Sequence, residues 1–192
     1  MSVNFSSANF ASANFIRAGM LAATLLSLGA CASAANPAMM SLTAGTAAAS
    51  PASEGQPGFH QLTVAQVQGG ADTNPLWASE VSNADFQNAL EASLKAFNYY
   101  VVDGAMGKYK VTASIVDVQK PLMGLDMSVT MKVRYSVSTA QGGTAFDDTI
   151  ATTGTATMGE AFAGADRVRM AIEKSAKLNI EVFLGRLWKE LK

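Results

Sequence analysis

The residue types that most often carry out chemistry are rare in this chain. It has 192 residues, with one cysteine, Cys31, and one histidine, His60. A serine hydrolase triad would have to use His60, yet no Gly-x-Ser-x-Gly nucleophile motif occurs in the sequence. A single cysteine forms no internal disulfide and provides no cysteine-based zinc site. We therefore expect no catalytic residue, no metal site and no cofactor, and a protein that is not an enzyme.

Three aspartates and a run of spaced glycines offer chemistry that their positions argue against. Asp126, Asp147 and Asp148 include candidates for a carboxylate pair that performs acid–base catalysis. Adjacent residues of a strand point to opposite faces, so Asp147 and Asp148 should not meet at one substrate.

Gly154 begins the glycine run, but no Gly-Lys-Ser/Thr of a phosphate-binding loop follows it. We expect Gly154 to bend the last strand.

Three methionines share one face of a predicted strand. Met123, Met127 and Met131 occupy odd positions, and thioether groups are suited to Cu(I). They alternate in one row with Leu125 and Val129, however, and methionine commonly fills gaps in protein cores. Core packing is therefore the expected role of these side chains.

The neighbourhood of Cys31 has the layout of an export signal. Arg17 is followed by an apolar stretch over residues 18–28, and the small residues Gly29 and Ala30 come directly before Cys31. This order is typical of a secretory signal peptide. The stretch is too short to span a bilayer, which needs roughly 20 apolar residues. An ordinary signal peptide cut at Ala30 or a neighbouring alanine remains the alternative.

Leu28-Gly29-Ala30-Cys31 resembles the lipobox of bacterial lipoproteins. The resemblance implies cleavage between Ala30 and Cys31, diacylglycerol on the Cys31 thiol, incorporation of palmitate and a membrane anchor. Ala32 is not the aspartate that retains lipoproteins in the inner membrane. The resemblance therefore implies lipid anchoring at the periplasmic face of the outer membrane.

The chain downstream divides into a low-complexity segment and a region of regular patterns. Residues 31–58 are rich in Ala, Ser and Pro and nearly uncharged, a composition that buries too little apolar surface to offset its ordering entropy. We expect a signal peptide over 1–30, a flexible tether over 31–58 and a single domain over 59–192. The chain has 14 basic and 15 acidic residues, a balance that argues against nucleic acid as a partner.

Hydrophobic periodicity predicts the elements of the domain. Residues 82–97 have apolar positions at helical spacing behind a capping Ser82 or Asn83, and residues 125–138 alternate strictly with period two. The remaining predicted elements are strands over 59–67, 99–102, 109–115 and 144–158 and a helix over 166–192. The order β-α-β-β-β-β-α predicts an α+β two-layer sandwich, with a mostly antiparallel sheet of about four to five strands and two helices on one face.

The long alternating strand also presents a polar face. Ser128, Thr130, Lys132 and Arg134 share it, so it is a possible surface for a partner. The alternative is a sheet face that is simply solvated.

The order of elements resembles small Gram-negative envelope lipoproteins of the YajG type and, more loosely, the LptE-like fold. The segments that carry the resemblance are Phe86–Phe97 running into Asn98-Tyr99, Val133-Arg134-Tyr135, and Gly159-Glu160-Ala161-Phe162. It implies a non-enzymatic accessory or binding role in envelope assembly or transport, with an envelope protein or a lipid as partner. The alternative is a lipid or small ligand bound in a pocket between helices and sheet. A filled interior at Phe86, Leu90, Ile180 and Leu184 would favour a protein partner, and an open cleft there would favour a lipid.

Overall fold

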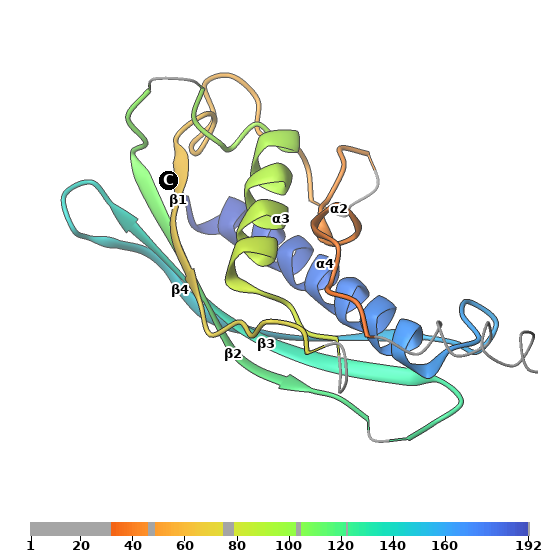
Figure 1. The fold of residues 1–192 in the computed structure, drawn as a ribbon. Helices are drawn as coiled ribbons and strands as arrows, with labels where there is room; N and C mark the ends of the chain where they lie inside the picture. Colours follow the sequence, from red (N-terminus) through yellow and green to blue (C-terminus); the bar gives the residue numbers. More distant parts are fainter. Residues whose placement is uncertain (1–31, 46–48, 75–78, 103–104, 122, 192) are drawn as a thin grey trace, which may run out of the picture. The chain divides into compact units, whose positions relative to one another are not determined.

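Four strands form one mixed sheet in the order β1-β2-β3-β4, and the helices pack on one of its faces (Figure 1). The computed structural model describes residues 32–45, 49–74, 79–102, 105–121 and 123–191. The strands are β1 Leu62–Gln68, β2 Tyr109–Gln119, β3 Met127–Thr139 and β4 Thr144–Ala156. The helices are α2 Pro37–Met40, α3 Asn83–Ala96 and α4 Gly164–Glu190. The predicted α+β sandwich is confirmed.

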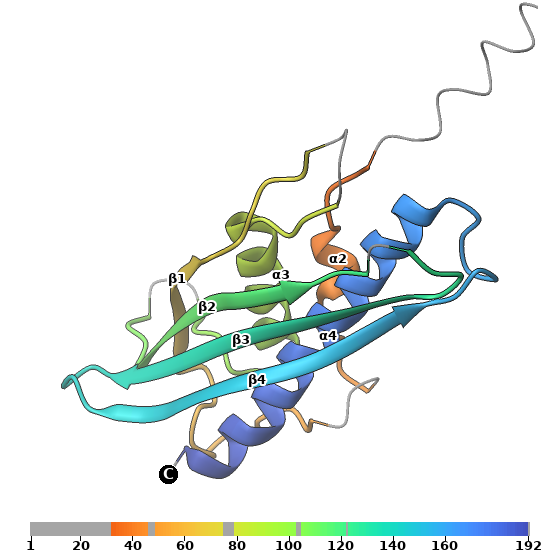
Figure 2. The ribbon, with the colours of Figure 1, turned by 90° about the horizontal axis from the view of Figure 1, so that it is seen from below.

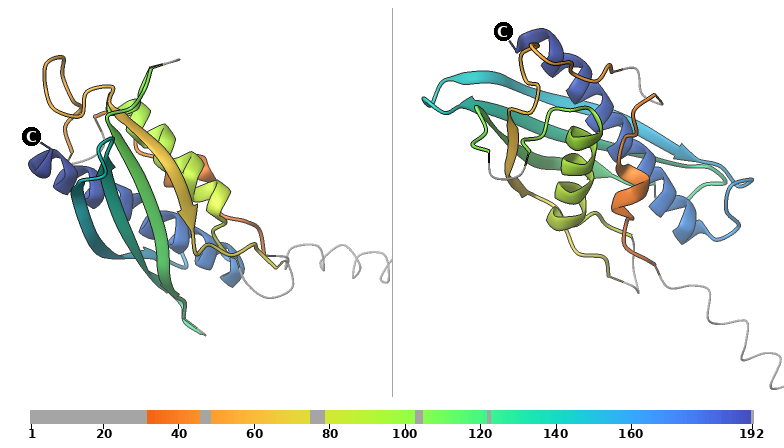
Figure 3. Two further views of the ribbon diagram at one scale, coloured as in Figure 1. Left: turned by 90° about the vertical axis from the view of Figure 1, so that its left-hand side faces the viewer. Right: turned by 90° about the horizontal axis from the view of Figure 1, so that it is seen from above.

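The connections between strands determine how they pair. β1 and β2 run parallel because α3 crosses over between them, whereas β2, β3 and β4 are joined by short loops and pair antiparallel. The sheet is thus mixed, with two of its three pairings antiparallel. Figure 3 shows both long helices on the same side of this sheet.

The helix predicted from Phe86 to Phe97 is α3. Ser82 is its N-cap, and the Ser82 hydroxyl accepts a hydrogen bond from the Asp85 backbone N–H at 3.0 Å. Phe86, Leu90 and Leu94 are fully buried, as their spacing predicts.

A buried polar network attaches α4 to the centre of the sheet. The Tyr135 hydroxyl on β3 donates to Asn179 Oδ1 at 2.9 Å, and Asn179 Nδ2 donates to the Ile150 carbonyl of β4 at 2.9 Å. The Tyr135 ring stacks on Phe183 with 4.1 Å between centroids. Burial raises the pKa of the Tyr135 phenol well above its ordinary value, so this hydroxyl remains a neutral donor.

The helix also approaches β4 too closely for a side chain at Gly154. A Cβ atom there would lie 2.3 Å from the Ala171 carbonyl oxygen and 2.4 Å from the Ser175 backbone nitrogen. Gly154 was predicted to bend the strand. Its role in the structure is to let the backbone of α4 come close to β4.

The strand predicted over residues 99–102 is wrong. Tyr100 makes a single bridge to Leu62, and this segment forms no ladder. The fully buried Tyr99 side chain packs into the core instead. These residues have strand propensity, but β1 pairs with β2, so the segment has only one residue of partner strand.

The flexible tether predicted over residues 31–58 is also wrong for its described part. Met40 and Leu42 are buried in the main core, and the Leu42 N–H donates to the Ser93 hydroxyl of α3 at 2.9 Å. Asn36 caps α2 through its side chain, and Pro37 occupies the first turn. Burial of a few apolar side chains offsets the entropy that is lost when the segment becomes ordered. The average composition had suggested that this entropy would keep the segment flexible. Residues 32–192 consequently form one compact unit.

Candidate functional site

The sheet face opposite the described helices is the candidate site. Figure 2 views the sheet from this side, with β2, β3 and β4 in front of α4. The predicted residues Ser128, Thr130, Lys132 and Arg134 all lie on it, because they alternate along β3 with fully buried or nearly buried side chains. The alternation in the sequence thus predicted this face correctly.

Hydroxyl pairs cross from β3 to β4 over half of this face. The Ser128 and Thr155 hydroxyls lie 2.8 Å apart, and the Thr130 and Thr153 hydroxyls lie 2.8 Å apart. Each pair joins residues that are directly opposite in the register. Each hydroxyl has one partner and keeps further capacity to donate or accept.

Ion pairs occupy the other half. Lys132 Nζ lies 3.3 Å from Asp117 Oδ2 on β2, and Arg134 makes two hydrogen bonds of 2.9 Å to the two carboxylate oxygens of Asp147 on β4. Arg134 donates these hydrogen bonds to the charged form of Asp147 and so lowers the pKa of that carboxyl. The same bonds raise the pKa of the Arg134 guanidinium. The face therefore presents fixed, locally neutral charge pairs.

The adjacent aspartates do not converge, as predicted. Asp147 pairs with Arg134 on the open face, whereas Asp148 pairs with Arg186 of α4 on the helical side. Asp126 lies elsewhere and accepts a hydrogen bond from the Met158 backbone N–H at 3.2 Å. These three carboxylates therefore form no shared acid–base site.

The contacts of His60, Met127 and Met131 are of a structural kind. His60 Nδ1 lies 2.9 Å from the Tyr100 carbonyl oxygen, and its ring contacts Phe59 edge-on. Met127 and Met131 are buried in the core, as expected. Among the described residues, no group of three or more His, Cys, Asp or Glu side chains could hold a metal ion.

The interior between helices and sheet is filled at the four positions chosen above to distinguish a protein partner from a bound lipid. Phe86, Leu90, Ile180 and Leu184 are each fully buried in the main core. An apolar recess of about 500 Å³ lies instead at the surface of α4, where Trp188 is one of its lining residues.

Sequence reasoning missed a group of exposed apolar residues in two loops. Met123 and Leu125 were assigned to the buried row of β3, but the strand begins at Met127 and both side chains are exposed. Met158 and Phe162, in the loop before α4, are exposed as well. Period-two alternation continues past the end of the strand pairing, so it cannot mark that end. The available signal was Gly124, which interrupts the apolar run.

The lipobox residues Leu28, Gly29, Ala30 and Cys31 lie outside the described residues, as does the whole predicted signal peptide over 1–30. Within the part of the chain that the structure describes, no helix combines the length and the apolar character needed to cross a membrane.

Comparison with known proteins identifies the fold. No protein-family model matches the chain, and no curated protein matches its sequence. A Xanthomonas campestris protein of the DUF330 family aligns with a TM-score of 0.53 and 12% identity, over 77% of this chain and 94% of its own. A candidate lipoprotein from Caulobacter crescentus aligns with a TM-score of 0.48 and 12% identity, over 70% of this chain and 92% of its own. A hypothetical protein from Chlamydia trachomatis aligns with a TM-score of 0.47 and 9% identity, over 68% and 96%. The chain is thus similar in fold to the DUF330 protein.

Proposed function

We propose that this chain is a lipoprotein, anchored through lipid on Cys31 at the periplasmic face of the outer membrane. Its α+β domain serves there as a non-enzymatic accessory protein that binds another envelope protein. The resemblance to envelope lipoproteins of the YajG type and to the LptE-like fold gives this role its setting, envelope assembly or transport.

The observation that carries the proposal is where the folded unit starts. The compact unit begins at Ala32, the residue directly after the cysteine of the Leu28-Gly29-Ala30-Cys31 sequence. Ala32 is already nearly buried, and the Ala35 N–H donates to the Glu80 carbonyl at 3.2 Å. Cleavage before Cys31 would leave this unit entire. A processing site read from sequence and a domain boundary read from packing therefore coincide.

The open sheet face supports a partner that is a protein. Its hydroxyl pairs and ion pairs are distributed over β2, β3 and β4 with both signs of charge interspersed. Such a surface favours a polar, flat partner through hydrogen bonds around fixed charges. The filled interior provides no equivalent room for an apolar ligand at Phe86, Leu90, Ile180 and Leu184.

Metabolic labelling tests the anchor. Cells that express the wild-type chain or Cys31→Ala are grown with labelled palmitate, and their membranes are separated by density. The expected result is label and outer-membrane flotation for the wild type, with both absent for Cys31→Ala. An unlabelled, soluble wild-type chain would contradict the lipoprotein proposal.

Site-specific crosslinking tests the partner face. A photoreactive residue replaces the exposed Ser128 on the sheet face, and a control replaces the exposed Lys95 on α3. We expect a discrete crosslinked protein from position 128 in intact cells, lost when Arg134 is also replaced by Glu. Equal crosslinking from positions 128 and 95 would argue against this face.

A further inference from the structure

Two loops at one end of the sheet expose large apolar side chains. Met123 and Leu125, in the loop between β2 and β3, are 87% and 71% exposed. Met158 and Phe162, in the loop between β4 and α4, are 48% and 89% exposed. We call these four residues the apolar rim. Soluble proteins seldom cluster exposed side chains of this size without a binding partner.

The two loops lie at the same end because of the strand register. Met127, the first residue of β3, pairs with Ala156, the last residue of β4. The loop before Met127 and the loop after Ala156 therefore leave the sheet together. The Met158 backbone N–H donates to Asp126 Oδ1 at 3.2 Å and ties one loop to the other.

The exposure of Phe162 is built into the fold. The buried Arg167 donates through Nη1 to the Ala161 carbonyl at 2.8 Å and to the Phe162 carbonyl at 2.6 Å. At the start of the same loop, Glu160 accepts from the Thr157 backbone N–H at 3.0 Å. These contacts hold the loop backbone in place while the Phe162 ring points to solvent.

Glu160 adds a second attachment of this loop to α4. Lys174 Nζ donates to Glu160 Oε1 at 2.6 Å and to the Thr155 carbonyl at 2.8 Å. The Lys174 ammonium donates to the charged form of Glu160 and so lowers the pKa of that carboxyl, which favours its charged form. The charges of Glu160 and Lys174 are thus paired with each other.

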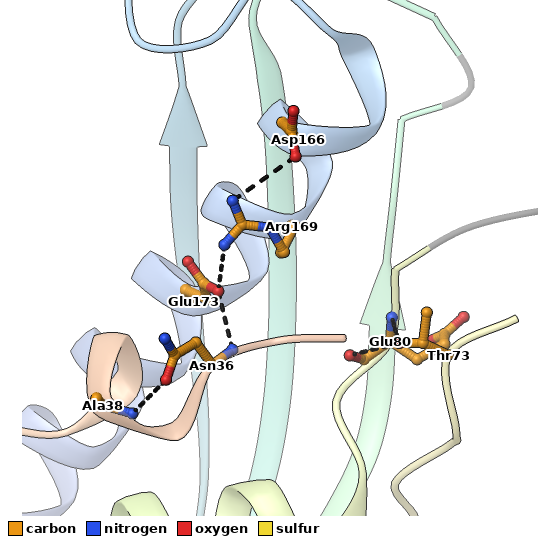
Figure 4. A network of polar contacts seen from close by, with 7 residues as sticks. All are labelled: Asn36, Ala38, Thr73, Glu80, Asp166, Arg169 and Glu173. Carbon is orange, nitrogen blue, oxygen red and sulfur yellow. Dashed lines mark hydrogen bonds and ion pairs between the residues drawn. The ribbon is translucent and has the colours of Figure 1, made fainter. Parts of the chain in front are cut away.

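The start of the folded unit contacts α4, where Figure 4 shows Asn36 beside Glu173. The Ala35 N–H contacts the Glu80 carbonyl, and the Glu80 carboxylate pairs with Lys120, the first residue of the loop between β2 and β3. The Asn36 N–H donates at 2.9 Å to Oε1 of Glu173, which lies in the third turn of α4. The chain therefore enters the fold between α4 and Glu80, whose carboxylate pairs with the first residue of one rim loop.

We propose that the apolar rim inserts into the interfacial region of the membrane that holds the lipid on Cys31, and so fixes the orientation of the domain. This inference rests on the proposed lipid anchor. Ala32 is bonded to Cys31 and is already packed, so no spacer separates the lipid from the domain. The four side chains of the rim are uncharged, which suits them to the headgroup–acyl boundary.

The occupant is a bilayer because the lipid itself would bring one to the domain. A covalent acyl anchor holds the chain at the membrane surface, so exposed apolar side chains of the domain gain contact with acyl chains without any further encounter. Insertion would leave the polar sheet face free for a protein partner, since that face carries its own paired charges.

Tryptophan quenching in vesicles tests the rim. Phe162→Trp is introduced into a chain whose natural tryptophans are replaced in Trp77→Phe and Trp188→Phe. The lipidated protein is reconstituted in phosphatidylethanolamine–phosphatidylglycerol vesicles with brominated acyl chains. The control is Met106→Trp in the same background, because Met106 is 97% exposed and precedes the opposite end of β2. The 11 residues of β2 span roughly 36 Å between the two ends.

We expect the tryptophan at position 162 to shift its emission to shorter wavelength and to lose about half of its intensity, given a burial depth of about 5–10 Å. The tryptophan at position 106 should behave as in water. Equal behaviour of the two probes in protein that floats with its lipid would overturn the rim proposal and leave the anchor intact. A wild-type chain that carries no lipid would overturn both. Matching far-ultraviolet circular dichroism and matching urea midpoints of the variants verify that each is folded.

Discussion

Replacing Met40 by alanine should destabilise the domain, although Met40 lies in a segment whose composition suggests a flexible tether. Met40 is fully buried, and α2, to which it belongs, packs against α3 and α4. Truncating a buried methionine to alanine costs about 2–5 kcal/mol through lost burial and the cavity left behind. For a domain of this size, that loss lowers the melting temperature by roughly 4–20 °C.

The neighbouring Met39 provides a matched control. Its side chain is 55% exposed, so Met39→Ala removes the same atoms from the same short helix without opening a cavity. The free energy of unfolding should then change by less than about 0.5 kcal/mol. The assay is urea unfolding followed by circular dichroism, in chains that begin at Ala32. Equal midpoints for Met40→Ala and Met39→Ala would refute the packing of this segment.

Four further substitutions, one of them a control, probe the sheet and its helix. Gly154→Ala should lower the free energy of unfolding by about 1–3 kcal/mol, because its Cβ meets backbone atoms of α4. Gly159→Ala, whose Cβ has only a hydroxyl at 3.8 Å, should leave the urea midpoint nearly unchanged. Asn179→Leu should cost about 1–3 kcal/mol for each buried polar group that it leaves unpaired, again measured by urea unfolding. Arg134→Gln should raise the pKa of Asp147 toward its ordinary value, measured by NMR titration of the carboxyl carbon.

The pH dependence of the last change has a definite sign. The folded-state pKa of Asp147 is lowered, so the ion pair with Arg134 contributes above the ordinary carboxyl pKa and is lost as the pH falls through the lowered value. Both groups are solvent-exposed, and the effect on stability should be small and weaken with salt. An unchanged pKa of Asp147 in Arg134→Gln would contradict the bidentate pairing.

Elements with long, regular patterns could be predicted from the sequence. The apolar spacing from Phe86 to Leu94 predicted α3, and the alternation along residues 125–138 predicted the polar face of β3. Short segments could not be predicted, because their conformation depends on partners far away in sequence. Tyr99 has strand propensity, but it is buried in the core rather than paired in a ladder.

The prediction of a flexible tether from the composition of residues 31–58 failed for a different reason. An average over many small residues hides the large buried side chains of Met40 and Leu42, which anchor the segment in the core. For the candidate site, the sequence indicated Lys132 and Arg134 but not their partners. Those partners depend on strand register, which places Asp147 diagonally across from Arg134 and Asp117 opposite Lys132.

The most direct test of the account is the intact mass of the mature protein from its native membrane. We predict a chain that begins at Cys31 and carries diacylglycerol on the thiol, so that its mass exceeds that of the polypeptide from Cys31 onward by the mass of the lipid. The Cys31→Ala variant should lack that added mass. A mature chain without lipid, or one whose first residue lies after Cys31, would contradict the central claim.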